Sequence, residues 1–140
     1  PDLKFYEMEF ISKANESNKP VMGLEKVAEQ LEFLNQSFSD DEMIAYLQQI
    51  DANMCTEMVK QYISQDVDGL YQMMIEKDSM STNTQKILLD NRNAKWVKIM
   101  PEMMQKESVF FAFGAAHLAG ENGVINLLKQ AGYSLKPIMN

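Results

Sequence analysis

Two of the chain's polar side chains stand where α/β proteins place their chemistry. His117, the only histidine among 140 residues, comes shortly after the apolar run Val109–Phe113. Glu25 directly follows a second short apolar run, Val21–Leu24. If both runs are buried parallel strands, both side chains lie at the carboxyl edge of the sheet, where open α/β sheets bind ligands. The alternative is that His117 is an ordinary turn residue packed against the helix that follows it.

A third residue, Arg92, interrupts an apolar helix face. Leu89, Trp96 and Ile99 share that face through their spacing of three and four residues. A guanidinium that points toward a core must find a carboxylate or a bound anion, because an unpaired buried charge costs several kcal/mol. The alternative is that the Arg92 side chain reaches solvent or pairs with another nearby acid.

The elements that would position these residues are mostly helices. Apolar residues recur every three or four positions, and two capping boxes, Ser39–Glu42 and Thr82–Gln85, mark helix starts. Asp2 is the predicted cap of the first helix, Pro101 is expected to kink or end the longest one, and Gly132 suits the C′ position of the last. The predicted helices cover residues 2–14, 26–38, 40–62, 66–78, 83–100 and 124–131.

The apolar runs are expected to form a small, mainly parallel sheet of about three strands. After Val109–Phe113, a helix leads to the alternating segment Tyr133–Ile138, and strand, helix, strand is a βαβ unit. The predicted fold is therefore α/β, in a single domain spanning residues 1–140. A helical lobe of about residues 40–105 is inserted between the first two strands, because this segment far exceeds what a crossover needs.

The composition excludes several kinds of partner and site. The chain carries 13 Lys and Arg against 20 Asp and Glu, a formal charge of −7, without the basic cluster that nucleic acid or an anionic membrane surface needs. One cysteine cannot form an internal disulfide or a cysteine-based zinc cluster, and one histidine excludes a site with two imidazoles. No run of about eighteen apolar residues occurs, so no transmembrane segment is predicted.

Three segments share their residues with the motifs of one protein family. They are Gly114-Ala115-Ala116-His117 with its glycine turn, Gly23-Leu24-Glu25 followed by Glu29-Gln30, and Asp90-Asn91-Arg92-Asn93 with Trp96. In their order along the chain they resemble the TraB/GumN family, which includes the pheromone-shutdown proteins and the TIKI metalloproteases. The histidine segment resembles the second G-x-x-H motif of that family. The resemblance spans Val21 to Ile138.

The resemblance implies a metal-dependent, peptidase-like hydrolase. It assigns His117 and Glu25 to a divalent-metal or catalytic site, with manganese or cobalt as the metal, and Arg92 to the support of that site. Because it also places Arg92 near the rim where Glu25 is expected, Glu25 becomes the best carboxylate partner for the guanidinium. A fold similar to half of a ChaN-like or erythromycin-esterase-like domain is implied as well, with a periplasmic, secreted or surface-anchored location.

The first G-x-x-H motif of the family has no counterpart here, so the chain resembles the C-terminal part of a larger domain. A catalytic zinc usually takes three protein ligands, and His117 and Glu25 supply two, so we expect neither tight metal binding nor activity from this chain by itself. The expected partner is a missing N-terminal half-domain or a second copy, and the expected substrate is a peptide. The rival interpretation is a binding module that holds a peptide or a small hydrophobic ligand under methionine-rich helices.

Overall fold

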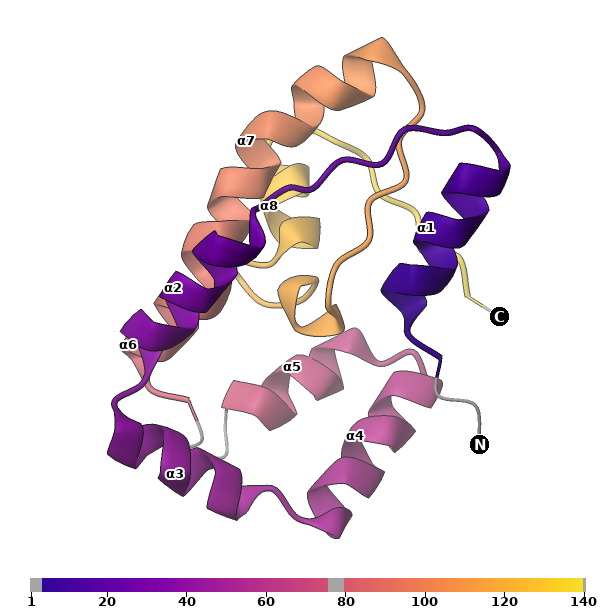
Figure 1. Ribbon diagram of the computed structural model, residues 1–140. Helices are drawn as coiled ribbons and strands as arrows, with labels where there is room; N and C mark the ends of the chain where they lie inside the picture. The colour runs from indigo at the N-terminus through magenta and orange to yellow at the C-terminus, as the bar shows by residue number, and fades with distance from the viewer. Residues whose placement is uncertain (1–3, 76–79, 140) are drawn as a thin grey trace.

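The computed structural model describes residues 4–75 and 80–139, and within them the chain is built from helices (Figure 1). The α-helices are α1 (Tyr6–Glu16), α2 (Val27–Ser37), α3 (Asp40–Gln49), α4 (Ala52–Ile63), α5 (Val67–Ile75), α6 (Thr82–Gln85), α7 (Asn91–Lys106) and α8 (Val124–Gln130). A π-helical turn, Lys86–Asp90, joins α6 to α7, and a 3₁₀ turn, Ala115–His117, precedes α8.

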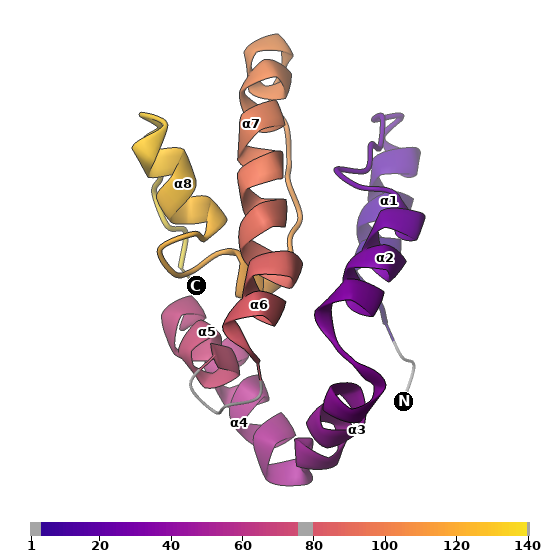
Figure 2. The same ribbon diagram turned by 90° about the vertical axis from the view of Figure 1, so that its left-hand side faces the viewer.

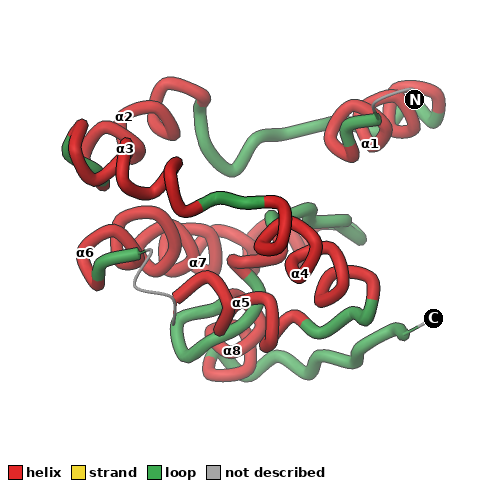
Figure 3. The backbone as a smooth tube through the Cα atoms, turned by 90° about the horizontal axis from the view of Figure 1, so that it is seen from below, coloured by secondary structure: helices red, strands yellow, loops and turns green. Residues whose placement is uncertain are grey.

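The predicted α/β fold is wrong. The described part of the chain contains no strand, so neither the parallel sheet nor the βαβ unit exists (Figure 3). The three segments predicted as strands are irregular and have no hydrogen-bonded neighbour strand: Val21–Leu24, Val109–Phe113 and Tyr133–Ile138. Their apolar side chains are used singly: Phe111 and Phe113 pack against a helical cluster, while other members of these runs remain exposed. An apolar run becomes a strand only when a second extended segment forms backbone hydrogen bonds with it. Here the side chains of such runs pack against helices instead.

Capping signals located helix starts well, with one shift. Ser39 caps α3: its Oγ accepts from the Glu42 N–H, and the Glu42 carboxylate accepts from the Ser39 N–H at 2.8 Å, which confirms that capping box. The second cap lies one residue earlier than the sequence pattern predicts. Ser81, instead of Thr82, caps α6, and its Oγ accepts from the Thr84 N–H at 3.1 Å. Asp2, the cap predicted for the first helix, lies outside the described residues.

Two helix ends differ from the prediction. The expected helix over residues 40–62 is two helices, because the Asp51 carboxylate accepts the Met54 N–H at 2.7 Å and starts α4. Pro101 does not end α7, which continues to Lys106. Met100 and Met104, on either side of the proline, both contribute to the core, so burial holds the helix together past the missing hydrogen bond.

The core lies along α7. Four buried side chains form its main cluster: Trp96, Met100, Val124 and Leu128. The helices that carry them, α7 and α8, lie side by side (Figure 1). The predicted C′ residue is confirmed: Gly132 has φ +90°, and the N–H groups of residues 132 and 133 donate to carbonyls in the last turn of α8.

A smaller cluster joins α5 to the turn before α8. It contains Tyr71, Leu89 and Ala119. A Cβ on Gly120, which has φ +86°, would lie 2.5 Å from the Tyr71 ring carbon Cζ. The glycine is therefore required both by its backbone conformation and by the closeness of the tyrosine.

The helices α1 to α4 form an arm: α1 and α2 lie on the side of α7 opposite to α8, and α3 and α4 lead from α2 to α5 (Figure 2). Neither α1 nor α4 contains a buried residue. Ser37, at the end of α2, is buried, and its carbonyl accepts from the Thr84 Oγ1 at 2.7 Å. The arm is thus joined to the core by polar contacts more than by apolar packing.

Candidate functional site

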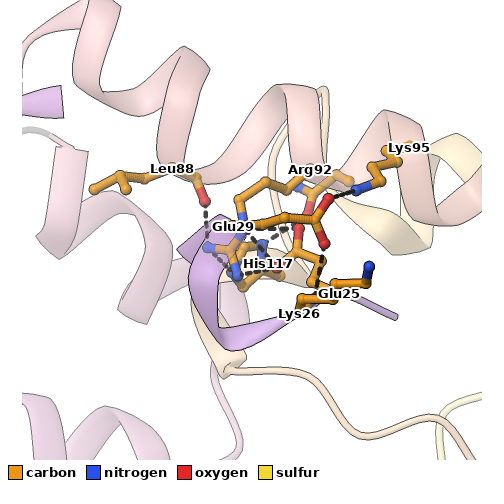
Figure 4. A network of polar contacts seen from close by, with 8 residues as sticks. Glu25, Lys26, Glu29, Leu88, Arg92, Lys95 and His117 are labelled. Atoms are coloured by element: carbon orange, nitrogen blue, oxygen red, sulfur yellow. Dashed lines mark hydrogen bonds and ion pairs between the residues drawn. The ribbon is translucent and has the colours of Figure 1, made fainter. Parts of the chain in front are cut away.

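An ion pair between Arg92 of α7 and Glu25, just before α2, forms the centre of the site (Figure 4). The Arg92 Nη2 lies 2.8 Å from the Glu25 Oε2, and the Arg92 Nε lies 3.1 Å from both carboxylate oxygens. The Glu25 side chain is 1% exposed and the Arg92 side chain 16%. The buried carboxylate is therefore fully compensated by one guanidinium, and the ion pair predicted from the sequence is present.

The guanidinium is held from other directions as well. Its Nη1 donates to the Leu88 carbonyl at 2.9 Å, within the π-helical turn that precedes α7. The rings of Phe33 and Trp96 lie 5.7 Å and 5.1 Å from the guanidinium carbon, at cation–π distance. These contacts fix the cation in one position between α2 and α7.

His117 reaches the same guanidinium from the 3₁₀ turn before α8. Its Nε2 lies 3.5 Å from the Arg92 Nη1, and its Nδ1 lies 2.7 Å from the Asn93 Oδ1. The ring is buried and contacts the Trp96 ring at a centroid distance of 4.6 Å. Burial and then the Arg92 charge lower the pKa of His117 to about 4, although the Glu25 charge acts in the opposite direction. His117 is therefore uncharged at neutral pH.

An exposed ion pair borders the centre where α2 begins. Lys95 donates to the Glu29 Oε1 at 2.8 Å, and the other Glu29 oxygen accepts from the Lys26 N–H at 2.8 Å (Figure 4). The Lys95 hydrogen bond and then the Lys26 backbone hydrogen bond hold the pKa of Glu29 below its usual value. Glu29 thereby ties the first turn of α2 to α7 directly beside Glu25.

The structure brings together all three residues that the sequence singled out. Glu25 and His117 contact different edges of the Arg92 guanidinium. The predicted reason for their meeting was wrong, because no sheet rim exists to carry them. Glu25 lies in a bend and His117 in a 3₁₀ turn, and α7 is the element that assembles both.

Sequence reasoning missed Asn93, which is 1% exposed and contacts His117. The phase chosen for α7 was wrong by about one residue. The buried stripe is Leu89, Asn93, Trp96 and Met100, spaced four, three and four, whereas Ile99 is 40% exposed. A polar residue within that stripe was the available signal. Arg92 lies at the edge of the stripe and reaches the site from there.

Glu25 and His117 do not fit a divalent metal in this arrangement. Both Glu25 oxygens accept from Arg92, and the same cation lies against the His117 Nε2. Across residues 4–75 and 80–139, no cluster of three or more His, Cys, Asp or Glu side chains could hold a metal ion. A metal between these two ligands would meet the charge of the guanidinium and would still lack a third protein ligand.

A sequence profile of the TraB/PrgY/gumN family matches residues 1–137. Metalloprotease TIKI1 of Xenopus tropicalis is 46% identical over 46 residues, which are 33% of this chain and 9% of the relative. Metalloprotease TIKI2 of Danio rerio is 24% identical over 111 residues, which are 74% of this chain and 21% of the relative. The chain thus spans a small part of both relatives. No solved structure matches it. None of the described helices is long and apolar enough to cross a membrane.

Proposed function

The chain belongs to the TraB/PrgY/gumN family, and from this premise we propose that it contributes the Glu25–Arg92–His117 centre to a peptidase-like hydrolase. The observation that supports the proposal is the buried contact of an acid, a guanidinium and an uncharged imidazole at one point. The two TIKI relatives are metalloproteases by name, and they suggest the peptide bond as the bond that is hydrolysed.

Each residue of the centre has a distinct proposed role. Arg92 is the electrophilic group, because a fixed guanidinium can stabilise the negative charge that develops on a carbonyl oxygen during hydrolysis. His117 is the proton acceptor, because an uncharged imidazole can take a proton from water. Glu25 is a positioning residue: its two oxygens orient Arg92 and are not free to accept a proton.

We do not extend to these residues the metal role that the sequence suggested for Glu25 and His117. A divalent metal, manganese or cobalt, would need Arg92 to leave the pair and at least one further ligand to join it. Cobalt is a direct probe, because its visible absorption reports its ligands. We expect no change in cobalt absorption that depends on His117.

Peptide hydrolysis by the natural polypeptide that carries this chain, at its native length, tests the proposed function. His117→Gln and Arg92→Met should each lower kcat/KM by at least about 100-fold. Lys98→Met, on the exposed side of α7, is the matched control and should leave kcat/KM unchanged. Wild-type rates in the His117→Gln variant, or no peptide cleavage by the wild-type polypeptide, would contradict the proposal. Tight peptide binding without cleavage would favour the rival binding module.

We also propose that another protein surface covers the arm, supplied by an N-terminal half-domain of a longer polypeptide or by a second copy. The accessible surface is 10,511 Å², whereas a compact monomer of 16.1 kDa exposes about 7,400 Å². On α2, Val27, Leu31 and Leu34 follow a spacing of four and three and are 74%, 58% and 43% exposed. Light scattering by the chain alone tests the second copy, since a dimer is then expected.

A further inference from the structure

We propose that Asn93 is a positioning residue that fixes the tautomer of His117, with the proton on Nδ1 and the lone pair of Nε2 turned toward Arg92. The assignment depends only on the hydrogen bonds around the two side chains. Its meaning for catalysis rests on the proposed function, in which His117 accepts a proton.

The orientation of the Asn93 amide is set by its contact with the turn before α8. The Asn93 Nδ2 donates to the backbone carbonyl of Asn122 at 2.8 Å. A carbonyl oxygen can only accept, so the amide nitrogen of Asn93 must be the atom on that side. The amide oxygen is then the atom that lies 2.7 Å from the His117 Nδ1.

This orientation decides where the proton of His117 lies. The Asn93 Oδ1 has no hydrogen to donate, so the short contact is a hydrogen bond only if Nδ1 carries the proton. In an uncharged ring, the lone pair then belongs to Nε2. The nearest polar group to Nε2 is the Arg92 Nη1, at 3.5 Å, which has only hydrogens to offer. The opposite tautomer would place two N–H groups against each other and two lone pairs against each other.

The turn that holds Asn93 is itself anchored. The Asn122 Nδ2 donates to the Asp90 Oδ2 at 3.2 Å, and the Gly123 N–H donates to the Gly120 carbonyl at 3.1 Å. A Cβ on Gly123 would lie 2.1 Å from the Ala119 carbonyl oxygen, so no other residue fits there without a backbone shift. The glycine turn thus serves as the support on which the Asn93 amide is oriented.

The consequence is that His117 presents one defined reactive atom. With Nδ1–H held by Asn93, Nε2 is the nitrogen that can accept a proton, and the hydrogen bond to Asn93 persists when it does. Because a protonated Nε2 has no lone pair for the Arg92 Nη1, the two groups must then move apart. Asn93 is 1% exposed, so its role is to orient the ring and not to touch the substrate.

Nitrogen NMR of the single histidine tests the assignment directly. At neutral pH, long-range ¹H–¹⁵N correlation should show a protonated Nδ1 and an unprotonated Nε2 in the wild-type chain. Asn93→Leu removes the acceptor and should shift the ring to a mixture or to the Nε2–H form. Asn91→Leu, at an exposed position of the same helix, is the matched control and should keep the wild-type pattern. A protonated Nε2 in the wild type, or an unchanged pattern in Asn93→Leu, would overturn the inference.

Asn93→Asp is the second variant, since it keeps an acceptor beside Nδ1 and should retain the Nδ1–H form even if Asn93→Leu does not fold. In the hydrolysis assay, Asn93→Leu should lower kcat about 10-fold or more with little change in KM, and Asn93→Asp should recover part of that loss. A wild-type Nδ1–H pattern without any hydrolysis would refute the proposed function alone. Hydrolysis that is insensitive to Asn93, together with an Nε2–H pattern, would refute the positioning role alone.

Discussion

The arm of α1 to α4 and the α7 region, residues 67–132, are both helical but are held by different forces. Every buried apolar side chain of the described residues lies between Leu70 and Leu128, whereas the buried side chains of the arm, those of Glu25 and Ser37, are polar. Two of the arm helices, α3 and α4, begin at well-formed caps, Ser39 and Asp51. Local capping is therefore enough to set where helices start, but only contacts distant in sequence create a core.

The two regions meet through polar bridges. Two ion pairs and one hydrogen bond connect the two ends of α2 to residues 84–95. They are the ion pairs Glu25–Arg92 and Glu29–Lys95 and the hydrogen bond from Thr84 to the Ser37 carbonyl. The candidate site lies at one of these bridges, so site geometry and attachment of the arm depend on the same ion pair. Substitutions in the α7 region should therefore affect stability much more than similar substitutions in the arm.

The largest effect is expected from Arg92→Met. This change leaves the Glu25 carboxylate buried without a partner and should lower the free energy of unfolding by about 3–5 kcal/mol, measured by urea denaturation. Lys60→Met, which breaks the exposed Lys60–Glu57 pair within the arm, is the control and should cost less than about 0.5 kcal/mol.

The double change Arg92→Met with Glu25→Gln should recover part of the loss, since it removes the unpaired charge. Equal stability of the wild type and Arg92→Met would show that the pair is solvated. The boundary between the two regions would then not depend on it.

A matched pair of leucines compares apolar packing in the two regions. Leu128 is 7% exposed in the core, and Leu31 is 58% exposed on α2. Leu128→Ala should cost about 3 kcal/mol, because it leaves a cavity, whereas Leu31→Ala should cost less than about 1 kcal/mol. Equal losses in urea denaturation would mean that another surface already covers α2 in solution.

The pH dependence of stability should report the buried histidine. The pKa of His117 falls from 6.5 to about 4 on folding, so the unfolded chain binds more protons between these values. The contribution of the uncharged ring to the free energy of unfolding is fully present above pH 6.5 and is lost as the pH falls toward 4. Between pH 7 and pH 5 the wild type should lose about 2 kcal/mol more than His117→Gln. Parallel pH profiles of the two proteins would contradict the buried, uncharged state.

The smallest effects are expected at the helix caps. Ser81→Ala should lower the free energy of unfolding by about 1 kcal/mol, because its Oγ caps a helix that leads into the core. Ser39→Ala should instead increase amide hydrogen exchange within α3 and change global unfolding less, because few buried contacts couple α3 to the core. Equal global losses would show that the arm unfolds together with the α7 region.

Much of the helical structure was predictable, whereas the sheet was a misinterpretation. The spacing of apolar residues by three and four positions, together with the capping residues, located α2, α3, α7 and α8, because these signals act within one or two helical turns. Phe110 and its neighbours have the β propensity of a buried strand, but Phe110 is 74% exposed and has no ladder partner. β propensity describes how a residue fits a sheet that already exists, so it cannot supply the sheet.

The candidate site shows the same division. The residue types of Glu25, Arg92 and His117, and the need of a buried guanidinium for a carboxylate, follow from the sequence alone. Asn93 was hidden because the helical phase was chosen around Ile99, and a shift of one residue turns a helix face by about 100°.

The sequence by itself determined most of the helical segments, the acidic charge, the single histidine and the family membership, because each depends on local pattern or composition. Only the tertiary structure decided that three irregular segments replace the strands, that Arg92 lies between Glu25 and His117, and that the Asn93 amide meets the imidazole. The physical reason is that these outcomes depend on which distant groups are close enough to satisfy a buried charge or donor. Proximity of that kind is set by packing and not by spacing along the chain.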